Sequence, residues 1–141
     1  MHTILFLTFL ACLTLTAVIH LLLPPEVALH FGAGGQPDGW GPKIVHTLLF
    51  LGLHTFLYFL FAILPRLIFR MPKELINLPN KEYWLSPEHR EEAHRQMETR
   101  MAQFGVATLV FMAAAMVLTA RANLREPVVL EQGWFFAGLF L

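Results

Sequence analysis

Three long apolar stretches, residues 4–23, 44–69 and 101–120, alternate with polar segments along the chain. About twenty apolar residues in a helix cross a hydrocarbon core of roughly 30 Å. The pattern therefore predicts an all-α integral membrane protein with three transmembrane helices, organised as a single membrane domain over residues 1–141.

The ends of these stretches carry helix-stop signals. Pro24 follows the first stretch, and proline removes a backbone donor and clashes with the preceding turn. Pro65 and Arg66 mark the end of the second stretch, although the apolar residues up to Phe69 extend it into the interface. A last apolar segment, 134–141, is too short to span, so we expect it to begin a fourth span in a chain that continues.

Basic residues are distributed unevenly between the polar segments. Seven of the ten Lys and Arg residues lie in residues 66–100, whereas the segment 24–43 contains only Lys43. Because basic loops stay on the cytoplasmic side, we expect the interval 70–100 in the cytoplasm and the loop 24–43 outside. This places the protein in a bacterial cytoplasmic (inner) membrane with a cytoplasmic N-terminus.

The third helix is expected to extend into the cytoplasm. Ser86 and Pro87 form a helix start, with a hydroxyl cap and a proline at the first helical position. Glu91 and Arg95 stand four residues apart and support the same helix. We therefore predict one continuous helix from about Pro87 to about Ala122.

The composition limits the classes of function that this chain can have. The chain is 56% hydrophobic and 14% charged, against about a quarter charged in an ordinary globular domain. The sequence has no basic face of the kind that would indicate a nucleic-acid partner. Because Cys12 is the only cysteine, an internal disulfide is excluded. No set of side chains resembles a catalytic site, so we expect neither an enzyme nor a cofactor.

The outer loop contains the clearest turn signal. Pro37-Asp38-Gly39 predicts a turn, because proline presets φ and an aspartate side chain binds nearby amides. Trp40 is expected to anchor the loop at the membrane interface, and Lys43 to reach lipid headgroups.

Histidines near this loop suggest a metal site. His20 and His46 each lie about one turn from the outer ends of their spans, and His30 lies between them near Asp38. Together they form a ligand set suited to zinc or copper, or a pH-responsive cluster. The alternative is a set of hydrogen-bonded interfacial histidines.

Three other histidines have different settings. His54 lies near the middle of the second span, where an ionisable group indicates a proton relay or a hydrogen bond to a neighbouring helix. His89 and His94 are five residues apart, which is not the zinc-protease spacing, and we expect them on a solvated helix.

Two motifs carry a family resemblance. The first comprises Leu23-Pro24, His30-Phe31, Gly35, Pro37-Asp38-Gly39-Trp40 and Lys43; the second is INLPNKEYWLSPEHREE (76–92), which includes Asn77, Pro79, Tyr83 and Trp84. They resemble a bacterial membrane family of unknown function, related to the N-terminal module of SdpI-type immunity proteins. That resemblance implies protection from a membrane-active toxin, but the chain lacks the longer C-terminal half of those proteins.

The first hypothesis is a non-enzymatic accessory or interaction subunit, in contact with the lipid bilayer and with a membrane-protein partner. Its contacts would be the small residues of the third span, such as Gly105, and the charged helical extension. The alternatives are a metal- or proton-handling protein centred on the outer histidines, and immunity to a membrane-active peptide.

Overall fold

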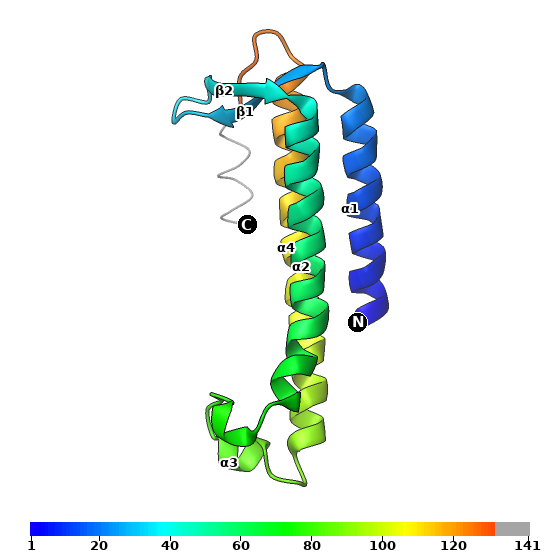
Figure 1. Cartoon of the computed structure of the whole chain (residues 1–141), viewed down its shortest axis with the longest axis vertical. Coiled ribbons are helices and arrows are strands. Elements are labelled where there is room, and N and C mark those ends of the chain that lie inside the picture. The colour runs from blue at the N-terminus through cyan, green and yellow to red at the C-terminus, as the bar shows by residue number, and fades with distance from the viewer. Residues whose placement is uncertain (132–141) are drawn as a thin grey trace.

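The computed structural model describes residues 1–131, and this part of the chain is mostly helical (Figure 1). The elements in chain order are α1 (His2–Leu22), β1 (Glu26–Phe31), β2 (Pro37–Pro42), α2 (Lys43–Arg70), the 3₁₀ turn η1 (Lys73–Leu75), α3 (Lys81–Trp84) and α4 (Arg90–Asn123). Of the described helices, α1, α2 and α4 are long and apolar enough to cross a membrane, in agreement with the three predicted apolar helices. The predicted start of a fourth span, 134–141, lies outside the described residues.

The three long helices lie side by side in up-down-up order, and each contacts the other two (Figure 1). No Asp, Glu, Lys or Arg interrupts α1, and none lies between Lys43 and Arg66 in α2. At 1.5 Å per residue that part of α2 is about 35 Å long, close to the roughly 30 Å of a hydrocarbon core. Charged residues thus delimit an apolar layer at both ends.

A buried glycine lets the three helices approach one another. A Cβ on Gly105 of α4 would lie 2.8 Å from Cβ of Phe61 in α2 and 3.0 Å from Cδ1 of Leu5 in α1. Small residues permit such close packing in membrane helices. Gly105, predicted as a contact for a partner, is instead used inside the bundle.

The segment 24–43 is not a simple loop. It contains an antiparallel hairpin of β1 and β2, so the all-α prediction is corrected to a mostly helical fold. The chain reverses between Gly32 and Gln36, whose backbone groups bond at 2.9 Å, and Gly35 adopts φ +76° there.

The turn prediction at Pro37-Asp38-Gly39 was wrong, because these residues lie in β2. Glycine reaches a left-handed φ without a steric penalty, so the reversal occurs at Gly35. The carbonyl of Gly35 also accepts a hydrogen bond from the Leu130 amide at 2.8 Å. A Cβ on Gly35 would clash with the Leu130 carbonyl oxygen.

The Lys43 side chain connects the start of α2 to the end of α1 rather than reaching away from the bundle. Its Nζ donates to the carbonyl oxygens of His20 and Leu23, each at 3.0 Å. These carbonyls belong to the end of α1, where helix carbonyls lack intrahelical partners. The Lys43 ammonium therefore caps α1, and the prediction that it extends to headgroups is corrected.

At the opposite end, α2 and α4 continue beyond the start of α1, and the chain between them folds against the pair (Figure 1). We call residues 68–97 the foot. It has its own small core of Phe69, Ile76, Leu85 and Ala93, with Ile68, Leu78, Trp84 and Met97 packed around them.

The start of α4 differs in detail from the prediction. The helix begins at Arg90, and the Ser86 hydroxyl contacts Nδ1 of His89 at 3.0 Å instead of capping the helix. The Arg95 side chain pairs with Glu92, one turn before it, rather than with Glu91. The helix nevertheless continues without interruption to Asn123, as the absence of breakers in the sequence predicts.

Candidate functional site: a basic pocket at the foot of the α2–α4 pair

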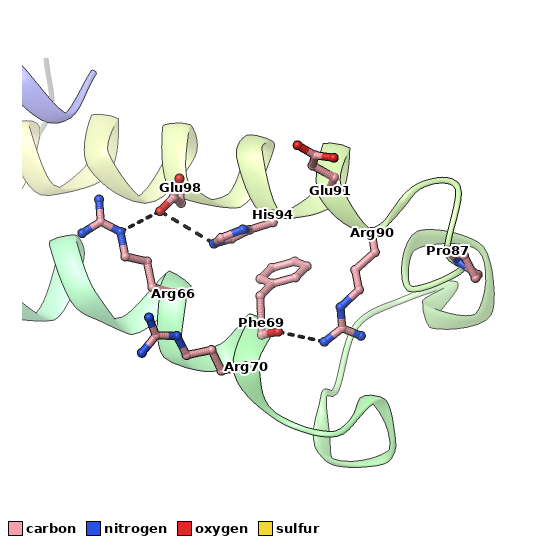
Figure 2. A pocket seen from close by; sticks show the side chains of 8 residues that line it. All are labelled: Arg66, Phe69, Arg70, Pro87, Arg90, Glu91, His94 and Glu98. Carbon is pink, nitrogen blue, oxygen red and sulfur yellow. Dashed lines mark hydrogen bonds and ion pairs between the residues drawn. The ribbon is translucent and has the colours of Figure 1, made fainter.

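An open pocket of about 460 Å³ lies between the last turns of α2 and the first turns of α4 (Figure 2). We call it the foot pocket. Its lining is dominated by charged side chains and comprises Arg66, Phe69, Arg70, Pro87, Arg90, Glu91, His94 and Glu98. Figure 2 shows Arg66 and Arg70 on the α2 side and Glu98, His94 and Glu91 on the α4 side.

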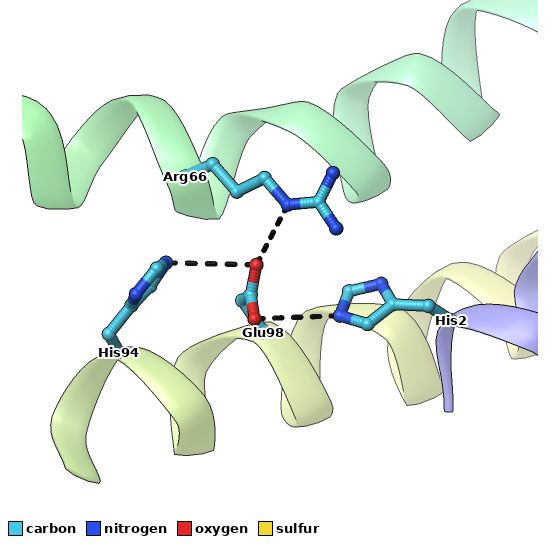
Figure 3. Close-up of polar contacts among 4 residues, drawn as sticks. All are labelled: His2, Arg66, His94 and Glu98. Carbon is cyan, nitrogen blue, oxygen red and sulfur yellow. Dashed lines mark hydrogen bonds and ion pairs between the residues drawn. The ribbon is translucent and has the colours of Figure 1, made fainter. Parts of the chain in front are cut away.

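Glu98 lies at one edge of the foot pocket, where Arg66, His94 and His2 surround its carboxylate (Figure 3). Its Oε1 accepts a hydrogen bond from Nε of Arg66 at 2.9 Å and lies 3.7 Å from Nε2 of His94. Its Oε2 lies 3.6 Å from Nε2 of His2, at the start of α1. One carboxylate thus connects all three long helices at the end of the apolar layer.

The Arg90 side chain caps the C-terminal end of α2. Its Nη2 donates to the carbonyl oxygens of Phe69 and Met71, at 2.8 Å and 3.3 Å. The last carbonyls of a helix lack intrahelical partners and carry partial negative charge. Arg90 therefore holds the last turn of α2 against the first turn of α4 and gives the pocket its shape.

The ring of Phe69 supports the His94 imidazole. Their ring centroids are 4.8 Å apart and the planes are tilted by 29°. His94 was expected on a solvated helix, and 36% of its side chain is exposed, whereas its Nε2 is buried and directed to Glu98. His89 lies outside the pocket, stacked on Tyr83 at 4.0 Å.

Two charged residues of the lining have no partner within residues 1–131. Arg70 and Glu91 are exposed, and neither side chain forms a hydrogen bond or ion pair in that part of the chain. Arg66 contributes only its Nε to Glu98, so its terminal nitrogens also remain available. The lining has three arginines against two glutamates, which leaves one excess positive charge.

The structure does not bring His20, His30 and His46 together as a metal site. Nδ1 of His20 lies 2.8 Å from Oγ1 of Thr47, and Nε2 of His46 lies 3.1 Å from Oγ1 of Thr119. Among the described residues, no group of three or more His, Cys, Asp or Glu side chains is arranged to hold a metal ion.

His30 and Asp38 form a separate pair on the exposed face of the hairpin. They come from opposite strands, beside the irregular pairing of His30 with Gly39. Asp38 is thus engaged by an imidazole across the hairpin.

His54 occupies the middle of α2. It is fully buried, and neither ring nitrogen has a hydrogen-bond partner among the described residues. The ring lies 6.1 Å from that of Phe50, one turn earlier. The expected bond from His54 to a neighbouring helix is therefore absent from this part of the chain.

The residues of the two family motifs lie at opposite ends of the molecule. Pro24 and Trp40 are exposed at the hairpin end, with Trp40 half-exposed as suits an interface anchor. Tyr83 and Trp84 lie in the foot, where Trp84 packs against the small core. Asn77 and Pro79 are exposed in the segment before α3.

Sequence reasoning did not select the residues of the foot pocket. The available signal was the spacing of Arg66 and Arg70, which are four residues apart and so share one face of a helix. Glu98 gave a local signal only toward His94, four residues earlier, because its other partners Arg66 and His2 lie 32 and 96 residues away along the chain.

One comparison with known proteins gives a match. Residues 7–55 match the family model described as a domain of unknown function, DUF1648. The matched segment takes in most of α1, the hairpin and the first half of α2, so it contains the first motif but not the second. It supports a relation to an uncharacterised membrane-type domain family.

Comparisons with curated proteins and with solved structures give no match. The relation to SdpI-type immunity proteins accordingly stays a prediction. The identity that follows from sequence and structure together is that of a small protein with membrane-type helices and a DUF1648-like segment.

Proposed function

We propose that this chain is a non-enzymatic interaction subunit of the bacterial cytoplasmic membrane, which binds a membrane-protein partner through its foot. The observation that carries the proposal is the foot itself. α2 and α4 extend past the start of α1, and the chain between them folds around its own core. A connection between two spans can be a short loop, and a folded foot with its own core instead presents a fixed surface to a partner.

The surface of the foot has the character of a contact site. Leu75 is 66% exposed, Tyr83 is 54% exposed and Met71 is 40% exposed. Beside them is a hollow of about 200 Å³, lined by Phe69, Leu78, Trp84, Ala93, Gln96, Met97 and Arg100. Exposed apolar side chains surrounded by charged ones are typical of protein interaction sites.

The orientation belongs to the same proposal. The basic residues of the interval 66–100 surround the foot, and such residues stay on the cytoplasmic side. The hairpin then lies outside, with Trp40 at the membrane surface. A cytoplasmic foot is reachable both by the membrane-embedded part and by the cytoplasmic part of a partner.

The test is purification of the tagged full-length chain from its native membranes in a mild detergent. We expect a second membrane protein to co-purify in stoichiometric amount with the wild type. The same partner should co-purify with Trp40→Ala, a control variant at the opposite end of the molecule. The double variant Leu75→Glu, Tyr83→Glu should lose that protein while keeping its own yield. Recovery of the chain alone, or equal recovery with the double variant, contradicts the proposal.

A further inference from the structure

We infer that the foot pocket binds a phosphate group, carried by a membrane lipid headgroup or by a soluble phosphate compound. The inference does not rest on the proposed partner. It rests on the arginine side chains of the lining, on the way in which Glu98 is already engaged, and on the position of the pocket at the end of the apolar layer.

The donors come from one face of α2. Arg66 and Arg70 stand four residues apart, and Figure 2 shows both side chains on the same side of the pocket. Like charges at this spacing destabilise a helix, and an anion between them would relieve the repulsion. The guanidinium fork matches the geometry of phosphate oxygens. Arg70 has no partner within residues 1–131, and Arg66 is engaged only through Nε.

Glu98 offsets one of the three arginine charges and is already engaged by neighbouring side chains. Arg66 and His94 engage its Oε1, and His2 lies beside its Oε2. Glu91 is the remaining carboxylate, exposed at the rim. With three arginines and two glutamates, the lining balances a singly charged anion. A phosphodiester carries one negative charge, so the charge balance favours a lipid headgroup over a doubly charged free phosphate.

The depth of the pocket agrees with that source. Arg66 stands about 35 Å along α2 from Lys43, where an apolar layer of about 30 Å ends. Between the two arginines Leu67 is 49% exposed, which places apolar and basic side chains together at one level. Basic pockets between membrane helices are recognised sites for acidic lipid headgroups.

The experiment uses the full-length protein, delipidated in a nonionic detergent and titrated under native mass spectrometry. The probes are phosphatidylglycerol, diacylglycerol as the same lipid class without phosphate, and inorganic phosphate. We expect one bound phosphatidylglycerol and no bound diacylglycerol. Arg70→Gln should weaken lipid binding about tenfold, as expected for the loss of charge-assisted bonds. Arg70→Lys keeps the charge but not the guanidinium fork, so its lipid affinity should lie between those of the wild type and Arg70→Gln.

Arg121→Gln is the matched control, since Arg121 is an exposed arginine at the other end of the apolar layer. It should keep binding within about twofold of the wild type. A lipid complex that inorganic phosphate does not displace assigns the site to lipid. Saturable binding of inorganic phosphate that is lost in Arg70→Gln assigns it to a soluble compound.

Equal lipid binding by the wild type, Arg70→Gln and Arg121→Gln, with no inorganic phosphate bound, would overturn the inference. Thermal unfolding of each variant shows that it is folded. The double variant Leu75→Glu, Tyr83→Glu should retain phosphate binding, because both residues lie outside the pocket lining. The failure of this inference is therefore distinguishable from failure of the proposed partner interaction.

Discussion

The side-chain amide of Asn123 bonds both backbone groups of Ala28. Its Oδ1 accepts from the Ala28 amide at 2.6 Å, and its Nδ2 donates to the Ala28 carbonyl oxygen at 3.0 Å. Nδ2 also donates to the carbonyl oxygen of Thr119, one turn earlier in α4. The end of α4 thus serves β1 as a neighbouring strand would, and it fixes the hairpin to the bundle.

Replacing Asn123 with alanine should destabilise the protein by about 1–3 kcal/mol, because both backbone groups of buried Ala28 lose their partner. The measurement is thermal unfolding in detergent, followed by circular dichroism. Asn77→Ala is the control at an exposed asparagine and should stay within about 0.5 kcal/mol of the wild type. Equal melting of the two variants would show that the pairing contributes nothing.

Two glycines of the membrane helices should respond in opposite directions to alanine. Gly105→Ala places a methyl group against Phe61 and Leu5 and should cost about 1–3 kcal/mol. A Cβ on Gly52 meets nothing within 4 Å. Gly52→Ala should therefore be neutral or stabilise by up to about 1 kcal/mol, through helix propensity. Unfolding in detergent distinguishes them, and a harmless Gly105→Ala contradicts the packing.

Glu98→Gln should loosen the junction of the three helices, because the neutral amide gives up its ion pairs with Arg66, His94 and His2. The expected loss is about 1 kcal/mol, since the groups are partly exposed to solvent. Limited proteolysis of the foot and thermal unfolding report it. Glu91→Gln removes from the same pocket a carboxylate that has no partner within residues 1–131, and it should leave both readouts unchanged. A Glu98→Gln variant as stable as the wild type refutes this role.

The proposed orientation predicts which positions react from outside the cell. In a Cys12→Ala background, Gln36→Cys in the hairpin should react with a membrane-impermeant maleimide in intact cells. Glu74→Cys in the foot should react only after the membrane is permeabilised. Both residues are exposed in the structure, so a lack of reaction reflects the membrane. The reverse pattern would place the foot outside.

Local features of the sequence were sufficient to predict the long helices. The apolar stretches 4–23 and 44–69 correspond to α1 and α2 within two residues at each end. The signal is local, because a span needs only length and apolar composition. The hairpin was missed because its turn depends on the left-handed φ of Gly35 and its position on Asn123, which lies 95 residues from Ala28.

The candidate site depended even more on distant contacts. Arg66 and Arg70 are recognisable as a basic pair on one helix face, but their sequence contains nothing about Glu98 or His2. Only the antiparallel packing of α2 and α4, with the start of α1 beside them, brings these residues together. The cluster predicted from His20 and His46 does not form, because His20 bonds Thr47 and His46 bonds Thr119 instead.

The central claim is that the foot contacts a membrane-protein partner, and photo-crosslinking in native cells tests it most directly. A photoreactive amino acid at Leu75 should give one discrete crosslinked species that contains another membrane protein. The same amino acid at Trp40, exposed at the opposite end, should not give that species. No discrete product from Leu75, or the same product from both positions, would contradict the account.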